Sequence, residues 1–252
     1  MPHRRSRRAH GLRTSALLGG LLGAIAVAVA VLLAASPDES EEVRPAASTH
    51  VERGTSDGRA PDPRGAERSP EPSPDAIEWR RSKAIGSHAS GRLVRGVALP
   101  AEGREWASWD PILKRRPNRE WRRWGTDRLV RTTLRVLREF GRVHPSAPRV
   151  AVGDLSRPEG GDFGPQFGSI GHASHQNGLD VDVYYPRLDE RVRPPKRPGQ
   201  VNLKLAQDLV DRFVAAGAEK VFVGPSLGLT GPSDVVVPLV HHDNHLHARL
   251  PL

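Results

Sequence analysis

The chain has 252 residues, of which 37% are hydrophobic, enough for one domain with a sizeable core but not for two large ones. It contains no cysteine, which excludes a disulfide framework and thiolate metal ligands. The formal charge of +9 is uneven: residues 1–14 hold five arginines and no acid, residues 36–75 have a net charge of −5, and residues 76–252 hold +9. A basic folded region indicates an anionic partner, and nucleic acid, a membrane surface and an anionic wall polymer all meet that requirement.

Residues 15–35 form an uncharged, apolar run after the basic tail 1–14. As a helix this run would be roughly 31 Å long, about the thickness of the hydrocarbon layer of a membrane. Basic residues before it and acidic residues after it predict a cytoplasmic N-terminus. We therefore expect a transmembrane anchor, and the alternative is a cleaved signal peptide. Both alternatives place the rest of the chain outside the cytoplasm, in the periplasm or the cell-wall space.

Residues 36–75 are rich in Pro, Ser, Glu, Asp and Arg and have almost no large apolar side chains, which predicts a disordered acidic linker. The folded domain is expected over 76–252, where helical and strand-like patterns follow each other without a regular βαβ repeat. This arrangement indicates an α+β fold. In chain order we expect strands and turns over 84–100, a helix over 124–145, a strand over 149–156, a Gly-rich loop, a strand over 179–185, a helix over 202–217, a strand over 220–225 and strand-like alternation over 234–250.

The helix expected over 124–145 has a stripe of apolar residues at helical spacing. Thr126 is its expected N-cap and Gly141 its expected end. An arginine-rich segment with tryptophans, residues 113–128, overlaps its start. The simplest interpretation of this segment is a solvated helix face. Contact with carboxylates of wall peptides or with anionic lipid is an alternative, and export argues against nucleic acid.

The stretch "SHQNGLDVDVYY", residues 174–185, combines a histidine with two carboxylates on a short apolar run. Alternate residues of a strand share a face, so one face carries Asp180, Asp182 and Tyr184, and the other carries Leu179, Val181 and Val183. Burying two carboxylates is unfavourable unless a positive group lies beside them. His175 lies on the loop before this strand, and Gly178 allows a tight turn that brings it back toward the acidic face.

The stretch "HHDNHLH", residues 241–247, offers a second set of ligands. His245 and His247 share one strand face, with Leu246 on the other. Hydrolytic zinc sites commonly use three His, Asp or Glu ligands and leave a fourth position to water. His175, Asp182 and His247 would complete such a set. Asp180 is then a candidate to accept an N–H from a ligating imidazole, although it could equally cap a neighbouring loop.

The wording "GHASHQNGLDVDVYY" together with "HHDNHLHARL" resembles the penicillin-insensitive murein endopeptidases. This family is part of a wider group with lysostaphin-type peptidases, D-Ala-D-Ala metallopeptidases and hedgehog domains, which share His-x6-Asp and His-x-His. The resemblance covers most of 82–250 and none of 1–75. It implies a small, mainly antiparallel sheet with flanking helices and a zinc ion in the sheet cleft.

The resemblance also implies roles for individual residues. His175, Asp182 and His247 would hold one zinc ion, and His245 and His242 would take part in catalysis. His172 would lie in the site and contact a second metal or the substrate. Some members of the family carry further ligands after the acidic strand, but the corresponding segment here has no histidine, so we expect a single zinc ion.

The function that we expect is hydrolysis of D-alanyl peptide crosslinks in peptidoglycan, with His245 as general base and His242 stabilising the oxyanion. Tyr184 either assists at the oxyanion or packs in the wall of the site. Ser174 and Gln176 either shape the loop or bind substrate. The expected partners are wall crosslinks and, through the N-terminal helix, the membrane, with no nucleic acid. A carboxypeptidase acting on stem peptides and a non-catalytic wall-binding module with a retained zinc site are the alternatives.

Overall fold

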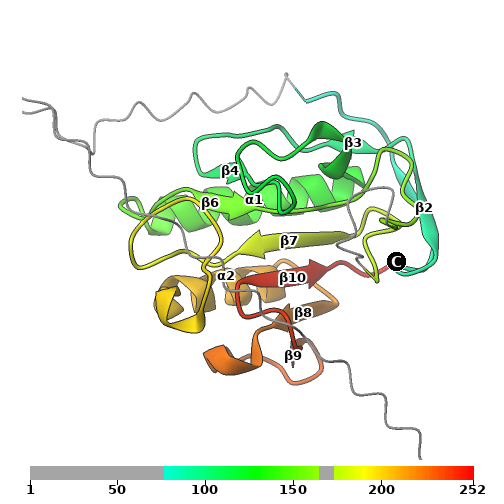
Figure 1. Ribbon diagram of the computed structural model, residues 1–252. Helices are drawn as coiled ribbons and strands as arrows, with labels where there is room; N and C mark the ends of the chain where they lie inside the picture. Colours follow the sequence, from blue (N-terminus) through cyan, green and yellow to red (C-terminus); the bar gives the residue numbers. More distant parts are fainter. Residues whose placement is uncertain (1–76, 165–172) are drawn as a thin grey trace, which may run out of the picture. The chain divides into compact units, whose positions relative to one another are not determined.

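The structure is a computed structural model that describes residues 77–164 and 173–252, all of them in one compact unit. Its centre is a six-stranded sheet with the strand order β4-β6-β7-β10-β8-β9, which is accompanied by two small two-stranded sheets and by the helices α1 and α2 (Figure 1). The four central strands pair antiparallel, while both edge strands pair parallel with their neighbours. The predicted α+β class is therefore confirmed, with a sheet that is mixed at its edges.

Most of the strands in the described residues are short. The strands are β1 Lys83–Gly86, β2 Gly91–Val94, β3 Val97–Ala98, β4 Trp106–Ser108, β5 Trp124–Gly125, β6 Val150–Val152, β7 Asp180–Tyr184, β8 Lys220–Val223, β9 Val236–Pro238 and β10 His245–Arg249. The helices are α1 Asp127–Val143 and α2 Leu203–Ala215, and three short 3-10 turns are η3 Glu120–Arg122, η5 Pro198–Gln200 and η6 Pro225–Leu227. The alternation over 234–250 resolves into β9 and β10 with a turn between them.

The two helices begin at side-chain caps. Thr126 Oγ1 accepts a hydrogen bond from the Leu129 amide at 3.1 Å, which confirms the predicted N-cap of α1. Asn202 Oδ1 caps α2 in the same way, at 3.2 Å from the Leu205 amide. Such a cap stabilises a helix by about 1 kcal/mol. Both helix starts are therefore fixed by local chemistry.

The predicted end of α1 at Gly141 is wrong, because the helix continues to Val143. A glycine is needed at this position for a different reason. A Cβ on Gly141 would lie 2.8 Å from Glu105 Cδ, which is too close for a real contact. The missing side chain therefore allows Glu105 to approach the helix, and the backbone stays helical.

One face of the central sheet is apolar and is covered by both helices. Val181 and Val183 of β7 lie opposite Ala248 and Leu246 of β10, and all four join the buried core with the inner sides of α1 and α2. The other face of the same two strands carries the charged residues. The sheet thus separates a hydrophobic core from a polar surface, which positions the candidate site.

The arginine-rich segment 113–128 differs from its interpretation as a solvated helix face. It contains turns, η3 and β5 before α1 begins, and Arg122 is fully buried. The Arg122 guanidinium forms a two-pronged ion pair with Asp154, at 2.7 and 2.5 Å. It also stacks on the rings of Trp121 and Phe163, at 5.0 and 5.1 Å. Burial is possible because a planar guanidinium satisfies a carboxylate and aromatic faces together.

The basic tail, the apolar run 15–35 and the acidic linker all lie outside the described residues, as does His172. Across 77–164 and 173–252, neither helix combines the length and apolar composition that a membrane crossing requires.

Candidate metal centre

The two predicted sets of ligands meet because β7 and β10 are neighbouring antiparallel strands. In their register, Asp182 lies opposite His247, and Tyr184 lies opposite His245. Opposite residues on paired strands share a face, so the acidic residues of β7 and the histidines of β10 point to the same side. The strand alternation predicted for both segments is confirmed.

The atoms that could bind a metal converge above this pair of strands. His175 Nε2 lies 3.4 Å from Asp182 Oδ1, and His247 Nδ1 lies 3.3 Å from the same oxygen. One donor atom from each of these three buried residues lies within 4.8 Å of the other two. Two ligand atoms on one tetrahedral zinc ion, each at about 2.0–2.1 Å, are roughly 3.3 Å apart. The donor types and the two measured separations fit a divalent metal.

His175 reaches the site from a loop with an unusual backbone. Its φ is +69°, a left-handed conformation that few residues other than glycine adopt, and Gly178 in the same loop has a φ of +76°. The His175 amide donates to Asp180 Oδ2 at 2.9 Å. Its ring Nδ1 donates to the Leu155 carbonyl at 2.5 Å. A neutral imidazole has one N–H, so this bond leaves Nε2 as the lone-pair donor that faces Asp182.

A hydrogen bond also orients the His247 ring, but here it is made by Nε2 and the nitrogen that faces Asp182 is Nδ1. Its Nε2 donates to Asp180 Oδ1 at 2.9 Å, which leaves Nδ1 facing Asp182. Burial would lower the pKa of His247, but the hydrogen bonds to Asp180 and Asp182 raise it to about 9. Asp180 therefore accepts an N–H from a candidate ligand and also caps the loop through the His175 amide, so it has both of the roles considered for it.

The two buried carboxylates are held in their charged form. Burial would raise the pKa of Asp182, but the nearby His175 and His245 imidazoles hold it well below its usual range. Burial acts in the same direction on Asp180, and the hydrogen bond and charge of His247, with His175 and Arg249, keep its pKa low. Arg249 Nε donates to Asp180 Oδ1 at 2.8 Å. The site thus presents anionic oxygen at neutral pH.

The two histidines predicted to be catalytic lie beside the triad. His245 Nε2 is 3.7 Å from Asp182 Oδ1, and His245 Nδ1 lies 2.6 Å from Asn244 Oδ1. The His242 ring stacks on the His245 ring with centroids 4.7 Å apart. His242 Nδ1 donates to the Val240 carbonyl at 2.9 Å, and burial lowers the pKa of His242. The neutral His242 ring therefore has its second nitrogen, Nε2, as an acceptor.

The remaining predicted residues lie around this centre. The Tyr184 ring is buried 5.8 Å from the His245 ring, and burial with nearby Asp154 and Asp182 raises the pKa of its hydroxyl well above 10. Gln176 Oε1 accepts from the Gly91 amide at 3.4 Å, a contact that ties the loop to the β1–β2 hairpin. Ser174 is buried in the same loop.

Several contributors were not predicted from the sequence. The Leu155 carbonyl orients His175 but is backbone, so no residue type identifies it. Arg249 could have been found, because it continues the alternation of His245 and His247 along β10. Phe222 of β8 lies opposite His247, and its ring meets the His247 ring edge-on at 5.4 Å. Only the strand pairing places Phe222 at the site.

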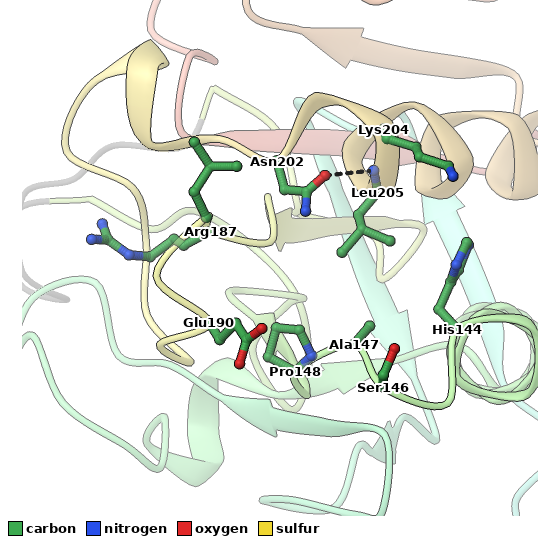
Figure 2. A pocket seen from close by; sticks show the side chains of 10 residues that line it. His144, Ser146, Ala147, Pro148, Arg187, Glu190, Asn202, Lys204 and Leu205 are labelled. Atoms are coloured by element: carbon green, nitrogen blue, oxygen red, sulfur yellow. Dashed lines mark hydrogen bonds between the residues drawn. The ribbon is translucent and has the colours of Figure 1, made fainter. Parts of the chain in front are cut away.

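A hollow of about 230 Å³ lies elsewhere, between the end of α1, the start of α2 and the loop after β7 (Figure 2). Figure 2 shows Lys204 and His144 near each other at one side of it and Glu190 at the other. Arg187 at its rim is held by Asp189, at 2.6 and 2.5 Å. None of the predicted site residues that the structure describes lines this hollow.

Comparison with known proteins indicates the family to which the chain is similar. Residues 84–220 match a family model described as penicillin-insensitive murein endopeptidase. A protein of that name from Haemophilus influenzae is 26% identical over 205 residues, which are 70% of this chain and 66% of the relative. One from Pectobacterium atrosepticum is 35% identical over 194 residues, 67% of this chain and 64% of the relative. The chain spans about two thirds of the length of these curated relatives.

Proposed function

Because the chain belongs to the penicillin-insensitive murein endopeptidase family, we propose that it is a metal-dependent endopeptidase that hydrolyses D-alanyl peptide crosslinks of peptidoglycan. The observation that carries this proposal is the convergence of His175 Nε2, Asp182 Oδ1 and His247 Nδ1 within 4.8 Å. The family match ends at residue 220, so the histidines of β10 are assigned from their geometry and from the resemblance described above.

We propose zinc as the metal, with one ion per chain. Nitrogen and carboxylate donors suit zinc, although other borderline divalent ions accept the same set. When bound, the metal supplies Lewis acidity that lowers the pKa of water and polarises a carbonyl group. The bonds from His175 to the Leu155 carbonyl and from His247 to Asp180 keep both ligand nitrogens directed at Asp182.

His245 is the proposed general base. Its Nδ1 faces Asn244 Oδ1 and donates to it, so the lone pair is at Nε2, 3.7 Å from Asp182 Oδ1. That nitrogen accepts a proton from the attacking water and returns it to the leaving amine. Asn244 acts by fixing which ring nitrogen carries the lone pair.

His242 and Tyr184 are the proposed donors to the developing negative charge on the carbonyl oxygen. The His242 ring has its Nδ1–H committed to the Val240 carbonyl, so donation from Nε2 requires the protonated ring. Burial lowers the pKa of His242, so negative charge developing on the substrate would have to favour that protonation. The high pKa of Tyr184 keeps its hydroxyl protonated at neutral pH, which makes it available as a donor. For Tyr184, packing in the wall of the site is the alternative.

The proposed location is outside the cytoplasm, with the chain tethered to the membrane by residues 15–35. This rests on the apolar run and the basic tail before it. The proposed partner is peptidoglycan and not nucleic acid. No serine nucleophile takes part, so β-lactams, which acylate a serine, would leave the activity intact.

The test is to incubate the purified chain with defined crosslinked muropeptide dimers and to identify the products by mass spectrometry. We expect dimers to become monomers, the activity to disappear with a chelator and zinc to restore it. His245→Ala should lower the rate about 10²–10⁴-fold while metal binding persists. A matched control is Lys114→Gln, an exposed residue in the turn between β4 and β5.

Three outcomes would contradict the proposal. Release of terminal alanine from monomers while dimers stay intact would identify a carboxypeptidase. Intact dimers and monomers, with a metal bound and wall material retained by the chain, would identify a binding module. A β-lactam that abolishes cleavage when a chelator does not would exclude the metal mechanism.

A further inference from the structure

Five arginines form a row along the outer side of α1. They recur at alternating intervals of three and four residues, the spacing that keeps side chains on one helical face, and all five are exposed: Arg128, Arg131, Arg135, Arg138 and Arg142. At 1.5 Å per residue the row is about 21 Å long. We call this set the arginine row.

The positive charge of the arginine row is only partly balanced within the helix. The two acids of α1 are Asp127 and Glu139. Asp127 Oδ2 is 4.0 Å from Arg131, while its Oδ1 accepts from the Ser82 amide. Glu139 is 3.9 Å from Arg212 of α2, so its charge is shared outside the row. Like charges three or four residues apart disfavour a helix, so an anion that binds along the row would relieve this repulsion.

Two members of the arginine row are held in place by local contacts. The Arg131 guanidinium lies 3.8 Å from the centre of the Trp79 ring, and Arg128 donates to the Pro251 carbonyl. Neither contact neutralises a charge. Guanidinium groups that are already ordered lose less side-chain entropy when an anion binds. These contacts therefore favour an anion-binding surface over a helix face that contacts only water.

The arginine row and the candidate metal centre lie on opposite sides of the sheet. The inner side of α1 packs into the core with Val181 and Val183 of β7, and the row is on its outer side. The triad lies on the other face of β7 and β10. A group bound at the row therefore does not reach the candidate metal centre, and a single partner that contacts both would have to extend around the domain.

We propose that the arginine row is a docking surface for the peptidoglycan polymer itself, which it binds through the carboxylates of the stem peptides. This proposal rests on the proposed function, because it names a second contact with the same substrate. Guanidinium groups bind carboxylates in a two-pronged geometry, and a row of them fits anions repeated along a strand. A meshwork can be held at one side of the domain while a neighbouring crosslink enters the site at the other.

The alternative partner, an anionic membrane, fits this surface less well. Helices that lie on membranes bury an apolar face among the lipids. In α1 the apolar face is already in the core, and every exposed residue between Asp127 and Arg142 is charged. A bilayer would bind the row through its headgroup phosphates alone, without the burial of an apolar face that holds surface helices on membranes.

The test measures binding of the full chain, in neutral detergent micelles, to purified insoluble sacculi by co-sedimentation. The test variant is Arg135→Gln with Arg142→Gln, since glutamine keeps helix propensity and removes two charges. The control is Lys114→Gln with Arg115→Gln, two exposed cations in the turn after β4. We expect about fivefold weaker binding for the test variant and a change of less than about twofold for the control. Added salt should weaken wild-type binding.

Three further readings separate the outcomes. When the carboxylates of the sacculi have been amidated, wild type and the test variant should bind these sacculi equally weakly. All three proteins should cleave soluble dimers at equal rates, because a dimer is too small to use both sides of the domain. If the protein leaves soluble dimers uncleaved but its binding to sacculi still depends on the arginine row, the proposed function is wrong and the docking surface is supported.

The docking surface is overturned if the test variant binds sacculi as well as the control does, or if amidation leaves row-dependent binding unchanged. It is also overturned in favour of a membrane if the test variant loses binding to phosphatidylglycerol vesicles, relative to the control, while its binding to sacculi stays normal. Circular dichroism of both variants checks that the helix is intact.

Discussion

Asp180 contacts three groups of the candidate metal centre at once. Its two oxygens accept from His247 Nε2 at 2.9 Å, from the His175 amide at 2.9 Å and from Arg249 Nε at 2.8 Å. The first contact selects the ring nitrogen of His247 that faces the metal position. The second holds the left-handed backbone of His175. One buried carboxylate therefore orients both candidate histidine ligands without lying among the candidate donor atoms itself.

We predict that Asp180→Asn weakens metal binding about 10–100-fold. An amide oxygen is a weaker acceptor than a carboxylate, and the amide nitrogen would face N–H groups that also need acceptors. A competition titration with a chelator measures the affinity. Asp189→Asn is the control, since Asp189 also pairs with an arginine but lies at the surface. Equal affinities for the two variants would show that Asp180 does not orient the ligands.

At the scale of single residues, the sequence predicts the candidate ligands better than it predicts the groups that orient them. Alternation along two short strands identifies Asp182 and His247, because each strand has one face that must enter the core. The partner of His175 is a backbone carbonyl at Leu155, and every residue has one. Arg122 looked like a solvated cation because its counter-ion, Asp154, is 32 residues away in the chain. Only the fold brings these groups together.

Among the elements, the segment from β4 to α1 combines little regular structure with buried charged residues. Arg122 and Asp154 form its inner ion pair, to which Asn118 Nδ2 adds a hydrogen bond at 2.9 Å. The Asp154 carbonyl oxygen also accepts from the Asp182 amide at 2.9 Å, so this network adjoins the strand that carries the candidate ligand Asp182. A disturbance here should reach the site through β7.

We predict that Arg122→Met destabilises the fold by about 3–5 kcal/mol, because it leaves the Asp154 carboxylate buried without its cation. Urea unfolding followed by fluorescence measures the change. Lys114→Gln, an exposed cation of the same segment, should stay within about 0.5 kcal/mol of wild type. Replacing both partners, Arg122→Met with Asp154→Leu, should recover much of the loss. A double variant no more stable than the single one would show that packing, not charge, explains the effect.

Asp110 makes the same segment sensitive to acid. Burial would raise the pKa of Asp110, but the amides of Leu113 and Ile112 and the Arg119 guanidinium hold it below its ordinary value of 3.8. A lowered folded-state pKa stabilises the fold above the unfolded value, and this contribution is lost as the pH falls through the folded one. Wild type should therefore be more stable than Asp110→Asn at pH 7, and the difference should shrink below pH ~4. Urea midpoints at several pH values test this, and a constant difference would refute it.

Element positions were predictable where a local pattern determines them. The caps at Thr126 and Asn202 and the apolar stripes specify α1 and α2 almost to the residue. Strand β4 was not predicted, because its three buried residues show no alternation and its role depends on parallel pairing with β6. The end of α1 was misplaced, since a glycine needed for close approach looks the same in the sequence as a glycine that ends a helix.

On the scale of the whole domain, the sheet joins groups that are far apart in the chain. The loop before β7 supplies His175, β7 supplies Asp182 and β10 supplies His247, and the antiparallel register brings the last two opposite each other. An unfolded chain has no such convergence. A metal that binds these donors must therefore bind the folded state far better than the unfolded one, and it must stabilise the whole fold.

We predict that zinc raises the melting temperature of the chelator-treated protein. At a free concentration of 100 times Kd the stabilisation is about 2.7 kcal/mol, which for a domain of this size corresponds to a shift of about 5–10 °C. Thermal unfolding at increasing zinc measures it. Asp182→Asn, which removes the charged donor of the triad, should show a much smaller shift, and Asp189→Asn should respond like wild type. An equal shift in both variants would place the zinc elsewhere, because only a site built by β7 and β10 makes the response depend on Asp182.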